Sequence, residues 1–283
     1  LASQLINGTA NFQNESLIAH EMSHAWFGNK VTCATAEDMW LNEGFATFCN
    51  YYYLSGVYGE QDFKDYMNEL INNIILSCHQ KEGWITLNNV SWDLTYGTTV
   101  YDKGAVIVNT MMNYLGRETF DATMKKYIEK FAFKAASSED LRDAVSEFSG
   151  VDMTDFFDTW VFTPGSPVYS VKSFTTKANG DKYDVEIVMN QRHRGAEHIG
   201  NSVRYELAFV DEDWTIQNEM VEWDGESATI TKTLDFEPVA IFCDYDNKFA
   251  DACHGYTYIA NKTGNKEFKD IRIKLVAKEI SDS

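Results

Sequence analysis

The pentapeptide His20-Glu21-Met22-Ser23-His24 limits the local fold and chemistry of this chain more than any other feature. It lies in the stretch 14–28, where Ile18, Met22 and Ala25 recur at helical spacing. Gly28 is a typical helix stop signal. The pattern therefore predicts one short helix that carries the whole pentapeptide.

On such a helix His20 and His24 lie nearly above one another, because residues four apart share a face. Their two imidazoles can then reach one metal ion, and neutral imidazole is a good ligand for zinc. Glu21 is rotated by about 100° from His20 on a 3.6-residue helix. We therefore expect Glu21 to face a water beside the metal, which is the general-base position of an H-E-x-x-H motif.

A third ligand is expected at Glu43, nineteen residues after His24. The stretch 38–55 has an apolar side and predicts a second helix, and Glu43 lies early in it. The residues between His24 and Glu43 suffice for a helix exit, a loop and a return alongside the first helix. Two packed helices would close a His-His-Glu site with one open position, the usual arrangement of a catalytic zinc, with one Zn²⁺ per chain. A solvated helix with two surface histidines is the competing interpretation, and a correctly spaced Glu43 argues against it.

The remainder of the chain divides into two parts by its periodicity. Helical spacing continues to residue 163, and we expect further helices over residues 62–79, 102–115, 117–131, 138–148 and 152–162. After Pro167 the apolar period becomes two, with strands expected near residues 183–189 and 203–209. Asn179-Gly180 and Asp224-Gly225 are hairpin turn signals. The predicted fold class is α+β, with a mainly helical domain over residues 1–165 and a small antiparallel β-sandwich over residues 166–283.

Four segments together resemble one known family. They are His-Glu-Met-Ser-His-Ala-Trp-Phe-Gly-Asn at 20–29, Trp-Leu-Asn-Glu-Gly-Phe-Ala at 40–46, Tyr-Asp-Lys-Gly at 101–104 with Tyr96 before it, and the order from Thr159 to Pro167. This pattern is similar to the zinc aminopeptidases typified by aminopeptidase N, which are gluzincin metallopeptidases with a thermolysin-like catalytic domain. The similarity spans about residues 10–170 and is weak beyond them.

The resemblance implies a role for each matching residue. His20, His24 and Glu43 would bind zinc, and Glu21 would be the general base. Tyr101 would donate a hydrogen bond to the oxyanion of the tetrahedral intermediate. The implied activity is hydrolysis of peptide bonds, most specifically removal of N-terminal residues, with a peptide as the substrate.

One family segment does not occur in this sequence. The family carries Gly-x-Met-Glu-Asn upstream of its zinc helix, where the glutamate helps to hold the free amino terminus of the substrate. This chain begins at Leu1, nineteen residues before His20, without such a segment. The interpretation is a catalytic domain truncated at its start and followed by a β-domain. We expect it to fold and bind zinc but to be weak or inactive as an aminopeptidase.

Composition excludes several other classes of protein. The 283 residues are 44% hydrophobic and 14% aromatic, which is typical of a folded globular chain. A formal charge of −19 argues against nucleic acid as a partner. No apolar run is long enough for a transmembrane segment, and no C-x-x-C spacing indicates a cysteine zinc site. The open alternatives are a zinc endopeptidase or other zinc hydrolase without an amino-terminal clamp, and a non-catalytic scaffold domain.

Overall fold

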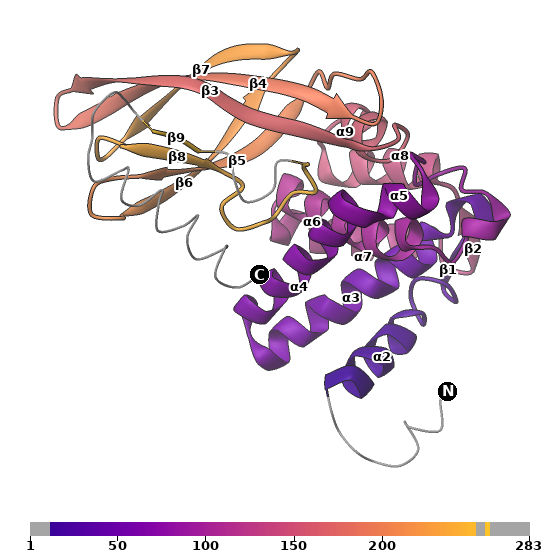
Figure 1. Ribbon diagram of the computed structural model, residues 1–283. Helices are drawn as coiled ribbons and strands as arrows, with labels where there is room; N and C mark the ends of the chain where they lie inside the picture. Colours follow the sequence, from indigo (N-terminus) through magenta and orange to yellow (C-terminus); the bar gives the residue numbers. More distant parts are fainter. Residues whose placement is uncertain (1–11, 253–257, 261–283) are drawn as a thin grey trace.

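The computed structural model describes residues 12–252 and 258–260, and it shows helices followed by two stacked sheets (Figure 1). A short parallel pair of strands, β1 and β2, joins two loops of the helical part. No helix in the described ranges is both long enough and apolar enough to cross a membrane. The elements of the helical part are α2 (Phe12–Ser23), β1 (Val31–Cys33), α3 (Trp40–Tyr58), α4 (Glu60–Asn73), α5 (His79–Glu82), α6 (Gly104–Leu115), α7 (Arg117–Lys130), β2 (Lys134–Ala136), α8 (Ser138–Ser149) and α9 (Thr154–Trp160).

Helix α6 forms the centre of the helical part. Every residue of α6 except Asn113 is buried, because its sequence is apolar on nearly all sides. Helix α3 packs against α6 and buries Trp40, Phe45 and Phe48 in the same core. Helix α2 lies beside α3 in turn, so α3 is held between the central helix and the predicted metal-binding helix.

Two antiparallel sheets make up the second part of the chain. One has the order β3-β4-β7 and the other the order β6-β5-β8-β9. Alternate residues of β4 and of β5 contribute to one common core, as expected for sheets that pack face to face, and all of β5 except Arg204 is buried. The predicted fold class is confirmed, while the domain boundary at 165/166, which falls between α9 and β3, stays a prediction. The strands are β3 (Ser166–Asn179), β4 (Lys182–Arg194), β5 (Val203–Val210), β6 (Ile216–Trp223), β7 (Ser227–Leu234), β8 (Ala240–Cys243) and β9 (Tyr258–Ala260).

The two predicted hairpin turns have different outcomes. Asn179-Gly180 joins β3 to β4 as expected, with Gly180 at a φ of 65°. Asp224-Gly225 also turns, with Gly225 at a φ of 73°, but β6 and β7 belong to different sheets. The prediction of a hairpin at Asp224-Gly225 is therefore wrong, because the chain crosses there from one sheet to the other.

The helix that carries the pentapeptide ends earlier than predicted. Helix α2 stops at Ser23, and the chain then turns back so that the Gly28 amide donates to the Val31 carbonyl. The apolar side predicted at Ile18 and Met22 is 42% and 62% exposed. Both side chains line a groove of about 710 Å³ between α2, α3 and α7, together with the core residues Phe45 and Phe48.

The segment before α6 differs from the predicted helix over residues 102–115. Helix α6 begins at Gly104, and a π-helical turn over Thr99–Lys103 precedes it. Tyr101 lies inside this turn instead of just before a helix. The predicted helix over residues 62–79 is similarly divided into α4, a second π-helical turn over Ile74–Cys78, and the first residue of α5.

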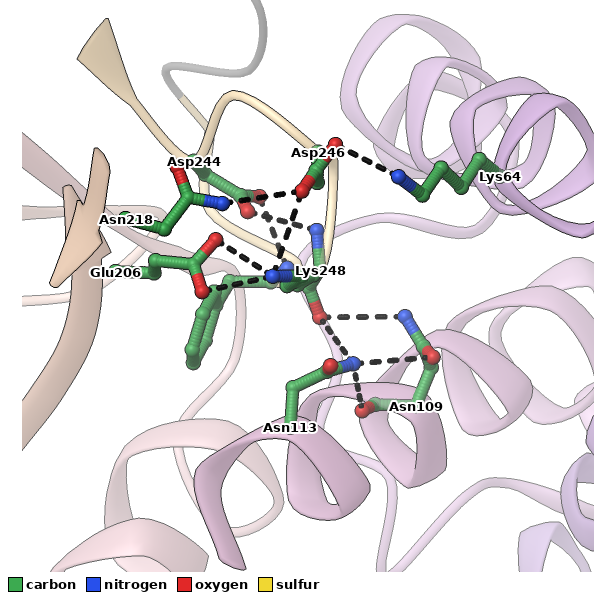
Figure 2. A network of polar contacts seen from close by, with 9 residues as sticks. Lys64, Asn109, Asn113, Glu206, Asn218, Asp244, Asp246 and Lys248 are labelled. Atoms are coloured by element: carbon green, nitrogen blue, oxygen red, sulfur yellow. Dashed lines mark hydrogen bonds and ion pairs between the residues drawn. The ribbon is translucent and has the colours of Figure 1, made fainter. Parts of the chain in front are cut away.

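A loop after β8 ties the sheets to the helices (Figure 2). The Lys248 ammonium lies 2.7 Å from both carboxylate oxygens of Glu206 on β5. Asp246, in the same loop, forms a 2.8 Å ion pair with Lys64 on α4. The Lys248 carbonyl accepts a hydrogen bond from the Asn109 amide on α6. The helical core and the β-part are thus joined by specific polar contacts as well as by apolar packing.

Candidate functional site

The three predicted metal ligands converge on one point between α2 and α3. The His20 and His24 Nε2 atoms are 3.2 Å apart, and each lies 3.3 Å from Glu43 Oε2. Within the described residues, these three side chains form the one group of histidine, cysteine or acidic residues close enough to share a metal ion. His24 belongs to the turn directly after α2, yet its ring still faces His20.

These separations fit a tetrahedral zinc ion. Zinc lies about 2.0–2.1 Å from histidine nitrogen and a similar distance from carboxylate oxygen, which places two tetrahedral donors about 3.3–3.4 Å apart. The three observed separations, 3.2 to 3.3 Å, agree with this value. Two imidazoles and one carboxylate are also a donor set that suits zinc. The residues present therefore fit the metal that the sequence predicts.

Contacts behind the donors orient the two rings. The His24 Nδ1 donates to the Phe27 carbonyl at 2.9 Å, which leaves Nε2 of the neutral ring free to bind a metal. Thr47 Oγ1 lies 3.5 Å from the His20 Nδ1. Thr47 is one helical turn beyond Glu43 on α3, so the same helix supplies a ligand and a contact to another ligand.

The charges at the site favour an ionised carboxylate. Burial opposes ionisation of Glu43, but hydrogen bonds from His20 and His24 outweigh it and lower its pKa to about 2. The hydrogen bond to Glu43 raises the pKa of His24. Glu43 therefore carries its negative charge at neutral pH, as a carboxylate ligand must.

Glu21 lies outside the ligand group, as its position on the helix predicts. Its side chain is exposed, and its charge contributes to raising the pKa of His24 and of Tyr101. The carboxylate is thus close enough to act electrostatically on both groups while remaining open to water. The structure places Glu21 beside the donors without testing its predicted role as a base.

Tyr101 reaches the donors from the π-helical turn. Its ring stacks on His20 with centroids 6.0 Å apart and an angle of 18° between the planes. Burial and the charge of Glu43 raise the pKa of Tyr101, so its hydroxyl keeps its proton and remains a donor. His20 and Tyr101 both line an open pocket of about 460 Å³. Tyr96, the weaker candidate, is 70% exposed and contributes through its charge to the pKa of Tyr101.

Two glycines that sequence reasoning left without a role bring Glu43 and Tyr101 together. A Cβ on Gly44 would lie 2.8 Å from Gly104 Cα, and a Cβ on Gly104 would lie 2.9 Å from Gly44 Cα. Helix α3 and the start of α6 therefore touch through bare backbone. In the sequence, Gly44 directly follows Glu43, and Gly104 directly follows Lys103 of the Tyr-Asp-Lys-Gly motif. This adjacency could have indicated that both glycines belong to the site.

Comparison with known proteins agrees with this site. The model of the peptidase family M1 domain matches residues 2–160. This chain belongs to the peptidase M1 family. The resemblance to the aminopeptidase N type of metallopeptidase is thereby confirmed, and the matched range includes all five predicted site residues.

Curated relatives are identical to this chain at about a third of the aligned residues. Aminopeptidase M1-B of Oryza sativa subsp. japonica is 32% identical over 179 residues, which are 61% of this chain and 20% of that protein. Aminopeptidase N of Lactococcus lactis subsp. lactis is 32% identical over 167 residues, 55% of this chain and 19% of that protein. The chain thus spans about a fifth of the length of these relatives.

A solved structure has the same fold. Legionella pneumophila aminopeptidase A, in complex with aspartic acid, superposes with a TM-score of 0.61 at 18% sequence identity. The superposition covers 83% of this chain and 26% of the other. Because it extends well past residue 160, it includes part of the β-sheets as well as the helices.

Proposed function

We propose that this chain is the catalytic part of a zinc-dependent aminopeptidase that removes N-terminal residues from peptides. The observation that carries the proposal is the convergence of His20, His24 and Glu43 at tetrahedral spacing, with Tyr101 stacked on His20. The M1 family membership and the aminopeptidase names of the relatives support the choice of substrate.

Each residue has a definite role in the proposed reaction. His20, His24 and Glu43 would hold one zinc ion, which when bound supplies a Lewis acid for the scissile carbonyl and lowers the pKa of water. The Glu21 carboxylate takes a proton from the attacking water and delivers it to the leaving amine nitrogen. The Tyr101 hydroxyl donates a hydrogen bond to the oxyanion that develops on the scissile carbonyl.

The exposure of Glu21 suits this proton transfer. A base that must meet water and then a leaving amine needs an open side chain, and Glu21 has one. Tyr101 has the complementary property, because its raised pKa keeps the proton in place. In the proposed reaction Glu21 accepts and releases a proton, whereas Tyr101 keeps its proton and donates only a hydrogen bond.

The decisive experiment is Glu21→Gln with two measurements. Zinc content should stay near one ion per chain, while hydrolysis of an aminoacyl-coumarin amide should fall by about 10²- to 10⁴-fold. Glu118→Gln, the same change at an exposed residue of α7, is the matched control and should alter neither quantity. Activity retained in the Glu21 variant would remove the proposed base.

The substrate class is tested separately with an N-acetylated version of the same substrate. An aminopeptidase should prefer the free amine. Preference for the blocked substrate would instead identify an endopeptidase. Absence of stoichiometric zinc from the purified chain would favour the non-catalytic scaffold.

A further inference from the structure

The π-helical turn that carries Tyr101 is capped by a residue from another part of the chain. The Thr98 amide donates to Glu82 Oε1 at 2.6 Å, and the Thr99 amide donates to Glu82 Oε2 at 2.9 Å. The first amides of a helical segment lack partners within it, and the side chain of Thr98 provides no cap here. Glu82, the last residue of α5, supplies both acceptors at once.

The surroundings of Glu82 show that its carboxylate is ionised and tightly placed. Burial opposes its ionisation, but hydrogen bonds from the Thr99 side chain and from the Thr98 and Thr99 amides outweigh burial and lower its pKa. A negative charge at the start of a helical segment is also favoured by the helix dipole. Gly97 makes room for the group, because a Cβ at Gly97 would lie 2.7 Å from Glu82 Oε1.

The same turn is held at two further points. The Asn73 amide donates to Asp102 Oδ2 at 2.7 Å, and Gly104 meets Gly44 through bare backbone. Glu82 therefore fixes the beginning of the turn while these contacts fix its end. Tyr101 lies between them, so the path of this backbone sets the position from which its side chain packs against the core and reaches Glu43 and His20.

We propose that Glu82 is a positioning residue that aims the Tyr101 hydroxyl into the site. This inference rests on the proposed function, in which Tyr101 acts on the oxyanion. Replacing one carboxylate oxygen by an NH2 group leaves one of the two backbone amides without its acceptor, lets the first residues of the turn move, and shifts the Tyr101 ring relative to His20. An angstrom-scale misplacement of such a donor costs rate without changing the chemistry.

The test is a double-mutant cycle between Glu82→Gln and Tyr101→Phe. With Tyr101 present, Glu82→Gln should lower kcat by about tenfold with little change in KM, because one of the two hydrogen bonds that align the turn is lost and the other is no longer charge-assisted. With Phe at 101 the same change should cost less than about twofold, since there is no hydroxyl left to aim. Equal losses in both backgrounds overturn the proposal.

Two variants control for general damage to the fold. Glu60→Gln removes an exposed carboxylate that pairs with Arg117 on the protein surface and should leave kcat unchanged. Gly97→Ala displaces the Glu82 carboxylate without removing its charge and should reproduce the loss seen in Glu82→Gln. A Gly97→Ala protein with unaltered kcat counts against the proposal.

A further measurement does not depend on turnover. The ring signals of Tyr101, in protein with labelled tyrosine and assigned through Tyr101→Phe, should shift in Glu82→Gln, and the Thr98 and Thr99 amides should exchange faster. An unmoved Tyr101 signal overturns the inference even where activity is too low to follow. If Tyr101→Phe itself leaves kcat unchanged while Glu82→Gln moves the ring, the role of Tyr101 fails and the positioning contact stands.

Discussion

Replacing Gly44 by alanine should destabilise the protein and disturb the site, although alanine is the better helix former. Gly44 lies in the first turns of α3, and the nearest atoms to an added Cβ would be Gly104 Cα at 2.8 Å, Gly104 C at 3.0 Å and the Val100 carbonyl oxygen at 3.1 Å. All three atoms belong to the backbone of the segment that carries Tyr101. No side chain can rotate away, so the two segments must separate.

The magnitude follows from two opposing effects. Alanine in place of glycine inside a helix gains about 1 kcal/mol. Overpacking in a well-packed core costs about 1–3 kcal/mol, and the upper end applies where backbone must move. The net expectation for Gly44→Ala is a loss of about 1–2 kcal/mol in the free energy of unfolding. Glu43 and Tyr101 move apart with the segments, so activity should fall as well.

Gly56 offers a matched control in the same helix. A Cβ at Gly56 would meet nothing within 4 Å, so Gly56→Ala keeps the gain in helix propensity without any clash. Urea denaturation should show Gly56→Ala stabilised by about 0.5–1 kcal/mol and Gly44→Ala destabilised. If Gly44→Ala is as stable as Gly56→Ala and keeps full activity, the close approach of α3 and α6 has no structural importance and the reasoning is refuted.

Three further measurements test the metal and the contact between helices and sheets. Removal of zinc by a chelator should lower the free energy of unfolding by about 2.7 kcal/mol relative to protein at a free zinc concentration of one hundred times Kd, and an unchanged melting temperature would contradict a folded-state metal site. Lys248→Met leaves the nearly buried Glu206 without its cation and should cost about 2–3 kcal/mol in urea denaturation. Lys182→Met, in an exposed ion pair, should leave the urea midpoint nearly unchanged. Burial of Asp246 is outweighed by its contacts with Lys64 and Lys248, so its pKa lies below 3.8. The contribution of Asp246 to the free energy of unfolding is therefore present above that pH and is lost as the pH falls through the lower pKa of the folded state. Lys64→Met should reduce this dependence of the free energy of unfolding on acid pH.

The fold class could be read from the sequence because it depends on periodicity alone. The change from helical spacing to alternation near Pro167 corresponds to the passage from α9 to β3. Element ends were harder to predict. Asp224-Gly225 has the chemistry of a hairpin turn, but partner choice is a tertiary property, and β6 and β7 pair in different sheets. The stretch 62–79 reads as one helix, although a π-helical turn interrupts it.

The metal donors were predictable for a different reason. Residues four apart on a helix point the same way whatever surrounds them, so His20 and His24 converge even though α2 ends at Ser23. The prediction of Glu43 as a ligand required only that a second helix return alongside the first. Glu82 was not predictable in this way, because its carboxylate accepts from amides sixteen and seventeen residues later, in a turn of unusual geometry.

Gly44 and Gly104 show why a chemical motif extends beyond its reactive residues. Glu43 supplies charge and Tyr101 supplies a proton donor, yet neither can determine how closely α3 approaches the turn before α6. That distance is set by two residues that carry no side chain and lie next to the chemistry in both motifs. Glu21→Gln and Tyr101→Phe, which leave the metal ligands in place, should therefore change rate at nearly constant stability, while substitution of either glycine should change both. A variant series scored for both quantities would separate the residues that perform the reaction from those that hold its parts together.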